Sequence, residues 1–248
     1  MKTLGVLGGM SWESTALYYR LVNQGVAARL GGLHSAKLLL HSVDFEAVAA
    51  LQRAGDWRGA ARLLAQAAAG LKAAGAEGLV IATNTMHKVA AVVEAEGGLP
   101  LLHIADATGE ALRAAGVRRA ALLGTRFTVD DPSIVRDRLE RRHGLALVLP
   151  AEEDRALMHR VIFDELCRGV VSDASRAAVV ALIARQRDAG AEAVILGCTE
   201  IALLIDAACS PLPVFDTTAL HAAAAVRWML DDTHEGATLP PPTEETPA

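Results

Sequence analysis

Short apolar segments alternate with longer amphipathic segments along most of the chain. The apolar segments have the length of strands, and Ala- and Leu-rich segments at 57–74, 133–142 and 173–189 have the spacing of helices. Alternation of strands with helices predicts parallel sheets that are covered by helices on both faces. The predicted strands are 3–7, 37–41, 78–82, 101–104, 119–123, 146–149, 193–197 and 212–215.

One stretch of the sequence is written twice. GAEGLVIATNT, which ends at Thr85, aligns with GAEAVILGCTE, which ends at Glu200, and this alignment places Thr83 over Cys198 at an offset of 115 residues (198 − 83). LGVLGGM and AALLGTR align at nearly the same offset, 116 residues (124 − 8). Two motifs that share an offset indicate a duplicated α/β unit.

The repeat predicts an α/β fold of two similar lobes, each a mainly parallel sheet flanked by helices. The lobes are expected to be related by a pseudo-twofold axis, with the active site in the cleft between them. Residues 1–115 and 216–232 are predicted to form the first lobe, because a last helix near 216–230 returns to it, and residues 116–215 the second. The Pro-, Thr- and Glu-rich end, 233–248, is predicted to be disordered.

Composition narrows the functional classes. The chain has 248 residues and a formal net charge of −5, and no face-wide cluster of Lys and Arg is evident, so nucleic acid is not an expected partner. No apolar run of about 18 residues predicts a membrane span, and the first residues read as a strand rather than a signal peptide. The three cysteines lack C-x-x-C spacing, so we expect reduced thiols in a cytoplasmic protein and no metal site.

The loops that follow the predicted strands carry the candidate chemistry, because ligands bind at the carboxyl ends of parallel strands. Cys198 ends one strand, and a helix that begins there would lower the pKa of its thiol toward neutrality. Gly8 and Gly9 are expected to allow close approach of the backbone to a ligand. His87 and His221 are either polar partners in the site or buried histidines. The loops that follow the predicted strands are residues 8–14, 83–87, 125–128 and 198–201.

The motifs GGMSWEST, LQRAGDW, TNTMHK, LGTRFT and LGCTEI occur in this order, and on them the chain resembles the aspartate/glutamate racemase family. The resemblance covers about residues 2–230. It implies two α/β lobes that face one cleft, a reaction without pyridoxal phosphate or another cofactor, and an acidic amino acid as the substrate. It also implies a homodimer. In most members one cysteine from each lobe works on opposite faces of the substrate.

This sequence departs from that pattern at Thr83, which replaces the cysteine of the first lobe. The combination with TNTMHK resembles the branch that is specific for L-aspartate and L-glutamate. The resemblance implies that Cys198 is the base for the L enantiomer and that Thr83 lies opposite. It also implies substrate-binding roles for Met10, Ser11, Gln52, Asn84, Thr85, Thr125, Arg168, Thr199 and Glu200. Gln52 stands where aspartate racemases place an arginine, and Arg168 substitutes for an expected lysine.

A threonine hydroxyl has a pKa close to that of water, far above neutral pH, and is therefore not a competent base. We accordingly expect turnover of L substrates and poor turnover of D substrates. Two other functions fit a cleft with one thiol: a decarboxylase of the arylmalonate type from the same superfamily, and a protein that binds a small acid without catalysis.

Overall fold

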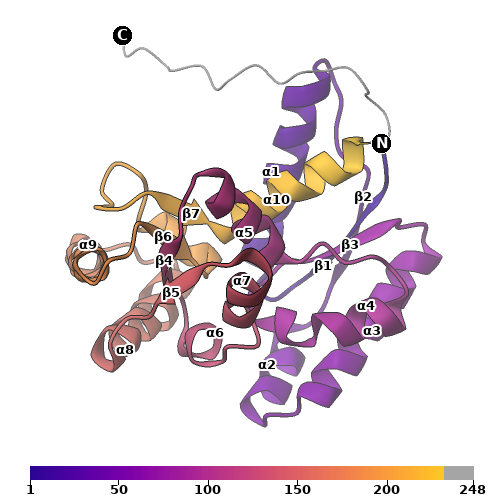
Figure 1. Ribbon diagram of the computed structural model, residues 1–248. Helices are drawn as coiled ribbons and strands as arrows, with labels where there is room; N and C mark the ends of the chain where they lie inside the picture. Colours follow the sequence, from indigo (N-terminus) through magenta and orange to yellow (C-terminus); the bar gives the residue numbers. More distant parts are fainter. Residues whose placement is uncertain (232–248) are drawn as a thin grey trace.

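Two separate parallel sheets organise the protein, and a computed structural model describes residues 1–231 (Figure 1). The first sheet has the strand order β2-β1-β3 and the second the order β5-β4-β6-β7. All pairings within both sheets are parallel, which confirms the predicted α/β class. The strands are β1 (Leu4–Gly8), β2 (Leu38–Ser42), β3 (Gly78–Ile81), β4 (Arg119–Leu123), β5 (Ala146–Val148), β6 (Ala193–Leu196) and β7 (Val214–Asp216).

Helices cover the sheets and connect their strands. The α-helices are α1 (Trp12–Leu30), α2 (Phe45–Arg53), α3 (Trp57–Ala73), α4 (Ala90–Gly97), α5 (Ile104–Ala114), α6 (Arg126–Asp130), α7 (Arg136–His143), α8 (Glu152–Arg160), α9 (Asp173–Asp188) and α10 (Thr217–Leu230). Short non-α helices are η1 (Thr85–Val89), η2 (Val161–Glu165, a π-helix), η3 (Leu166–Arg168) and η4 (Thr199–Leu203).

The sequence repeat corresponds to equivalent strands in the two sheets. β1 and β4 begin 115 residues apart (119 − 4), as do β3 and β6 (193 − 78). In the first sheet β1 lies between β2 and β3, and in the second sheet β4 lies between β5 and β6. The loops after β3 and β6, which carry Thr83 and Cys198, are therefore equivalent in the two sheets.

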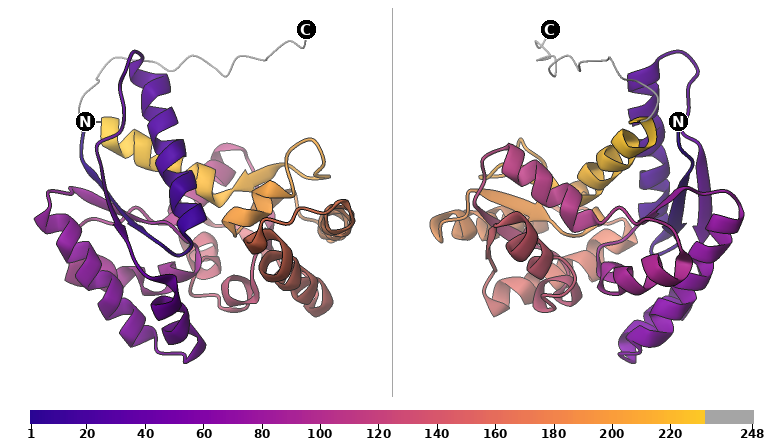
Figure 2. Two further views of the ribbon diagram at one scale, coloured as in Figure 1. Left: turned by 180° about the vertical axis from the view of Figure 1, so that it is seen from behind. Right: turned by 45° about the vertical axis from the view of Figure 1, so that its right-hand side comes forward.

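Alternate residues of the strands face two different cores. In the first sheet, Leu7 and Ile81 belong to a core with α3 and α4, whereas Leu4 and Val80 belong to a core with α1 and α10. The last helix packs on the first sheet, and Figures 1 and 2 show α10 beside α1.

The second sheet is covered in the same way. One face packs against α8, α9 and η2, and the other against α5 and α7. Ala105 and Leu112 of α5 lie in the core of this second face, although the helix precedes the predicted boundary at residue 115. That boundary stays a prediction, and the predicted disordered tail, 233–248, lies outside the described residues.

Local differences from the prediction have identifiable causes. The segment 101–104 forms only an isolated bridge from Leu101 to Leu79, because the ring of His103 accepts a hydrogen bond from the amide of Ala105 and starts α5. The helix predicted over 133–142 begins only at Arg136, since Asp131 accepts from the amide of Ser133 and closes a turn instead. No helix within residues 1–231 has both the length and the apolar character that a membrane crossing requires.

Candidate active site

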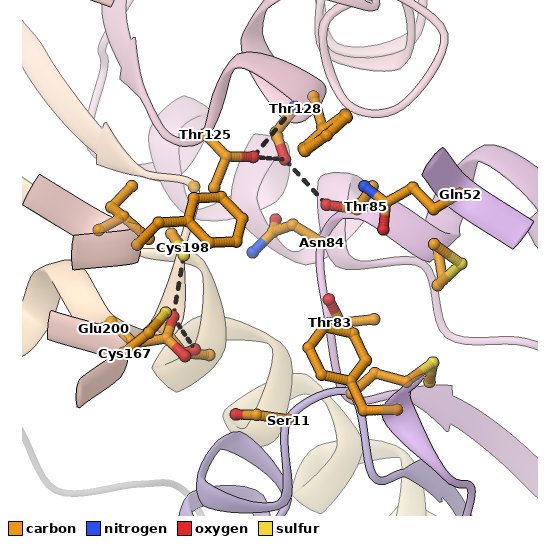
Figure 3. A pocket seen from close by; sticks show the side chains of 18 residues that line it. Ser11, Gln52, Thr83, Asn84, Thr85, Thr125, Thr128, Cys167, Cys198 and Glu200 are labelled. Atoms are coloured by element: carbon orange, nitrogen blue, oxygen red, sulfur yellow. Dashed lines mark hydrogen bonds between the residues drawn. The ribbon is translucent and has the colours of Figure 1, made fainter. Parts of the chain in front are cut away.

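A cavity lies where the carboxyl ends of the strands of both sheets meet (Figure 3). Its volume is about 100 Å³. Pockets for drug-sized ligands have volumes of roughly 300–1,000 Å³, so this cavity suits a small molecule. The lining residues are Met10, Ser11, Phe45, Gln52, Thr83, Asn84, Thr85, Met86, Thr125, Phe127, Thr128, Ile162, Phe163, Cys167, Gly197, Cys198, Thr199 and Glu200.

Cys198 follows β6 and precedes the short helix η4. Its Sγ donates a hydrogen bond to Glu200 Oε2 at 2.9 Å, and Thr199 Oγ1 donates to the same oxygen at 2.7 Å. Burial raises the pKa of the Cys198 thiol well above its usual range, and the Glu200 carboxylate raises it further. The expected lowering of this pKa is therefore wrong. The helix that follows is a 3₁₀-helix of five residues, and a carboxylate faces the thiol.

Thr83 follows β3, on the other side of the cavity from Cys198 in the view of Figure 3. Its carbonyl oxygen is 2.8 Å from Nδ1 of His87, whose Nε2 accepts from the amide of Ile104 at 3.2 Å. Since the backbone amide can only donate, the proton of the neutral ring is on Nδ1. Burial lowers the pKa of His87 and keeps the ring neutral. His87 therefore holds the backbone of the Thr83 loop from behind the cavity wall.

Asn84 lies in this wall, and the oxygen of its side chain is an unused acceptor. Its Nδ2 donates to Thr217 Oγ1 at 3.1 Å, and that hydroxyl donates to the Leu196 carbonyl at 2.8 Å, so the orientation of the amide is determined. Asn84 Oδ1 is buried and has no hydrogen-bond partner among the described residues. An unpaired buried acceptor is costly, and a ligand that donates a hydrogen bond would satisfy it.

A row of threonine hydroxyls crosses the cavity from the segment that follows β3 of the first sheet to the segment that follows β4 of the second. Thr85 Oγ1 from η1 is 3.2 Å from Thr128 Oγ1 in α6, and Thr125 Oγ1 is 3.4 Å from the same atom. Thr125 also caps α6 through a bond from the Thr128 amide to its hydroxyl. Each hydroxyl is both a donor and an acceptor, so this row can turn donors toward a carboxylate without a fixed charge.

The cavity contains every predicted site residue except Arg168. The side chain of Arg168 is 71% exposed and lies 3.9 Å from Asp164, so the sequence-based placement of this cation in the site is not reproduced. The two glycines of the first loop do not line the cavity either. A Cβ on Gly8 would lie 2.4 Å from Thr15, and one on Gly9 would lie 2.2 Å from the Val43 carbonyl, so both glycines allow close packing within the chain.

His221 is fully buried behind the site, and burial lowers its pKa to about 4. Its Nε2 is 2.8 Å from the Leu102 carbonyl, and its Nδ1 is 2.8 Å from the hydroxyl of Tyr18. Both nitrogens therefore have partners inside the protein. His87 and His221 are structural residues of the core, one of the two roles considered for them.

Several lining residues escaped the sequence analysis. Phe45, Phe127 and Phe163 come from α2, α6 and η2 and are about two-fifths exposed at the cavity. Phe127 lies in one of the predicted loops and could have been found, whereas no pattern marks Phe45 or Phe163. Cys167 also lines the cavity, and burial raises the pKa of its thiol to about 11.

Among the described lining residues, Glu200 is the sole carboxylate, and no lysine or arginine is present. No group of three or more His, Cys, Asp or Glu side chains within residues 1–231 is arranged to hold a metal ion.

Comparison with known proteins gives consistent results. Residues 7–225 match the family model described as Asp/Glu/Hydantoin racemase. A Yersinia pestis protein provisionally assigned as an Asp/Glu racemase is 52% identical, with a TM-score of 0.89 over 93% of this chain and 100% of that one. An aspartate racemase homologue from Pyrococcus horikoshii is 33% identical, with a TM-score of 0.80 over 92% and 99%. Glutamate racemase from Aquifex pyrophilus, at 16% identity, shares the fold with a TM-score of 0.59 over 92% and 84%.

Proposed function

We propose that this chain, which belongs to the Asp/Glu/Hydantoin racemase family, interconverts the enantiomers of an acidic amino acid, aspartate or glutamate, without pyridoxal phosphate. The reaction removes the α-proton from one face of the substrate and returns a proton to the opposite face. The solved structures that resemble this chain include a protein assigned as an Asp/Glu racemase and an aspartate racemase homologue, and both support an acidic substrate.

One observation carries this proposal: a thiol and a hydroxyl lie at equivalent strand ends of the two sheets and line one cavity. A base on one side of the α-carbon and an acid on the other are what inversion requires. The cavity is also small, which suits a substrate of nine or ten non-hydrogen atoms such as aspartate or glutamate better than a larger ligand.

In this mechanism Glu200 is the acceptor of the Cys198 proton. The thiol proton moves to Glu200 Oε2 along the existing hydrogen bond, and the thiolate then removes the α-proton of the L substrate. Thr83 donates its hydroxyl proton to the opposite face of the carbanion. Solvent then restores the proton on Thr83 and takes the proton from Glu200, so the numbers of protons gained and lost are equal.

The neutral polar groups of the cavity hold the substrate. Asn84 Oδ1, the buried acceptor without a partner, accepts a hydrogen bond from the α-ammonium group. Hydroxyls of the threonine row donate to the carboxylates. An ammonium donor is present in an amino acid and absent from a malonate, so Asn84 favours racemisation over decarboxylation.

The two acid–base groups are unequal, so exchange of the α-proton with solvent is faster from one enantiomer than from the other, although kcat/KM for inversion is equal in both directions because enantiomers have equal free energies. A thiolate is a competent base near neutral pH, whereas an alkoxide of threonine is not accessible there. L substrates accordingly exchange their α-proton through Cys198, and D substrates exchange theirs slowly.

The test is α-proton exchange in heavy water, followed by proton NMR. The purified protein is incubated without pyridoxal phosphate with L-aspartate, D-aspartate, L-glutamate and D-glutamate separately. Exchange mainly from an L substrate, lost in Cys198→Ala, is expected. Absence of exchange from all four would overturn the proposal, and α-aryl malonates and binding measurements would then test the decarboxylase and the binding protein.

A further inference from the structure

Within residues 1–231, four basic residues that lie close to lining residues along the chain are paired outside the cavity. Each of these lysines or arginines lies within two positions of a lining residue and forms an ion pair with a carboxylate outside the cavity. The pairs are Arg53 with Glu46, Lys88 with Asp131, Arg126 with Asp130, and Arg168 with Asp164. The carboxylate of Glu200 is thus the charge that a substrate meets in the lining.

A second carboxylate on the substrate gains little from such a cavity. Charge-assisted hydrogen bonds are roughly twice as strong as neutral ones, and the lining supplies neutral donors. Glu200 adds repulsion to any negative charge nearby. A side-chain amide, which has the shape of the carboxylate without its charge, avoids this repulsion and can form neutral hydrogen bonds of the same kind.

Gln52 is the group suited to recognise either side chain. It lies near the C-terminus of α2, lines the cavity, and makes no side-chain hydrogen bond to any described residue. In Figure 3 its side chain extends toward Thr85. A glutamine amide can donate to a carboxylate or to an amide oxygen, and it can accept from an amide nitrogen. The phenylalanines of the wall provide contact area that is independent of charge.

Resting on the proposed function, we infer that the enzyme also acts on L-amino acids with an amide side chain, L-glutamine and L-asparagine, and that Gln52 sets this selectivity. A site that recognises a substrate group through a matched partner rejects analogues by about 10⁴-fold or more. Here the kcat/KM values for α-proton exchange of L-glutamine and L-glutamate are expected to lie within about tenfold of each other.

The experiment compares exchange of L-glutamate and L-glutamine in heavy water for the wild type and three variants. Cys198→Ala removes exchange of both substrates if both use the same site. Gln52→Arg places a cation in the cavity and raises the preference for L-glutamate over L-glutamine by at least about tenfold, since the charge strengthens one pair of hydrogen bonds. Gln66→Arg makes the same substitution on the exposed side of α3 and leaves this preference unchanged.

The outcomes separate the two proposals. Exchange of L-glutamate with L-glutamine more than about tenfold slower would overturn this inference and leave the racemase proposal intact. An unchanged preference in Gln52→Arg would overturn the role of Gln52. Absence of exchange from the acidic and the amide substrates alike would overturn the proposed function and this inference with it.

Discussion

Glu200 controls the ionisation of Cys198, and replacing it with glutamine isolates that control. The thiol and the carboxylate are 2.9 Å apart. Two unit negative charges at this distance repel by about 1.5 kcal/mol at the dielectric constant of water and about 6 kcal/mol at an effective value of 20. Glu200→Gln removes this repulsion from the thiolate. Even the smaller figure makes thiolate formation about tenfold easier, because 1.36 kcal/mol corresponds to one pH unit.

The assay is the pH dependence of alkylation of Cys198 by iodoacetamide, because the thiolate is the form that reacts. Mass spectrometry of the peptide that contains Cys198 separates it from Cys167 and Cys209, which are also free thiols. The midpoint of the alkylation profile is expected at least about one pH unit lower in Glu200→Gln than in the wild type. Glu153→Gln, which neutralises an exposed carboxylate of α8 outside the cavity, is the matched control.

Exchange of the L substrate provides a second readout of the same variant. With Glu200 present the thiol passes its proton internally, so the rate is insensitive to the thiol midpoint. Without it the rate should follow the fraction of thiolate in the free enzyme. An alkylation midpoint that is the same in Glu200→Gln and the wild type would refute the pairing of thiol and carboxylate in solution.

Three further changes test other parts of the structure. Thr83→Ala removes the acid of the opposite face, so an L substrate should still exchange its α-proton through Cys198 while inversion to the D form falls by at least about 100-fold; parallel loss of exchange and inversion would contradict this. Because burial lowers the pKa of His221 to about 4 from an unfolded value near 6.5, the unfolded chain binds this proton first as pH falls, and stability should drop by about 2 kcal/mol between pH 7 and pH 5. In urea unfolding, His221→Gln should lose about this much less stability than the wild type between pH 7 and pH 5. The same pH dependence in both proteins would contradict the lowered pKa of His221. Gly78→Ala should lower the free energy of unfolding by about 1–3 kcal/mol, because its Cβ would lie 2.5 Å from the ring of Trp228. Gly70→Ala in α3 meets no atom within 4 Å and should raise the free energy of unfolding by up to about 1 kcal/mol. Equal unfolding free energies for the two variants would contradict this packing.

The arrangement of strands could be read from the sequence because strands of a parallel sheet are buried on both faces and appear as unbroken apolar runs. The predicted strand 119–123 coincides with β4, and 193–197 differs from β6 by one residue. Apolar runs also occur where a chain leaves a sheet. Leu101 makes one bridge to β3 before His103 caps the next helix, and periodicity does not distinguish such a segment from a strand.

The composition of the candidate site was predictable only in part. Residues at strand ends were found because the topology of parallel sheets brings them together, and Thr83 and Cys198 are examples. The ionisation of the Cys198 thiol could not be predicted, because it depends on the direction in which the Glu200 side chain points. Phe45 and Phe163 come from helices that no strand-end rule identifies.

The sequence repeat makes Thr83 the counterpart of Cys198, and Thr83→Cys tests that equivalence directly. If the two positions serve opposite faces of one α-carbon, a thiol at position 83 supplies the base that the D enantiomer lacks. The rate of α-proton exchange from D substrates should then rise, by about 100-fold or more if the new thiol acts as a general base, while exchange from L substrates changes little. The new thiol has no carboxylate two residues on, where Thr85 stands instead of a glutamate, so D turnover should follow its own ionisation and increase with pH. A variant with an ordered fold, unchanged L exchange and no gain with D substrates would mean that position 83 does not reach the face opposite Cys198.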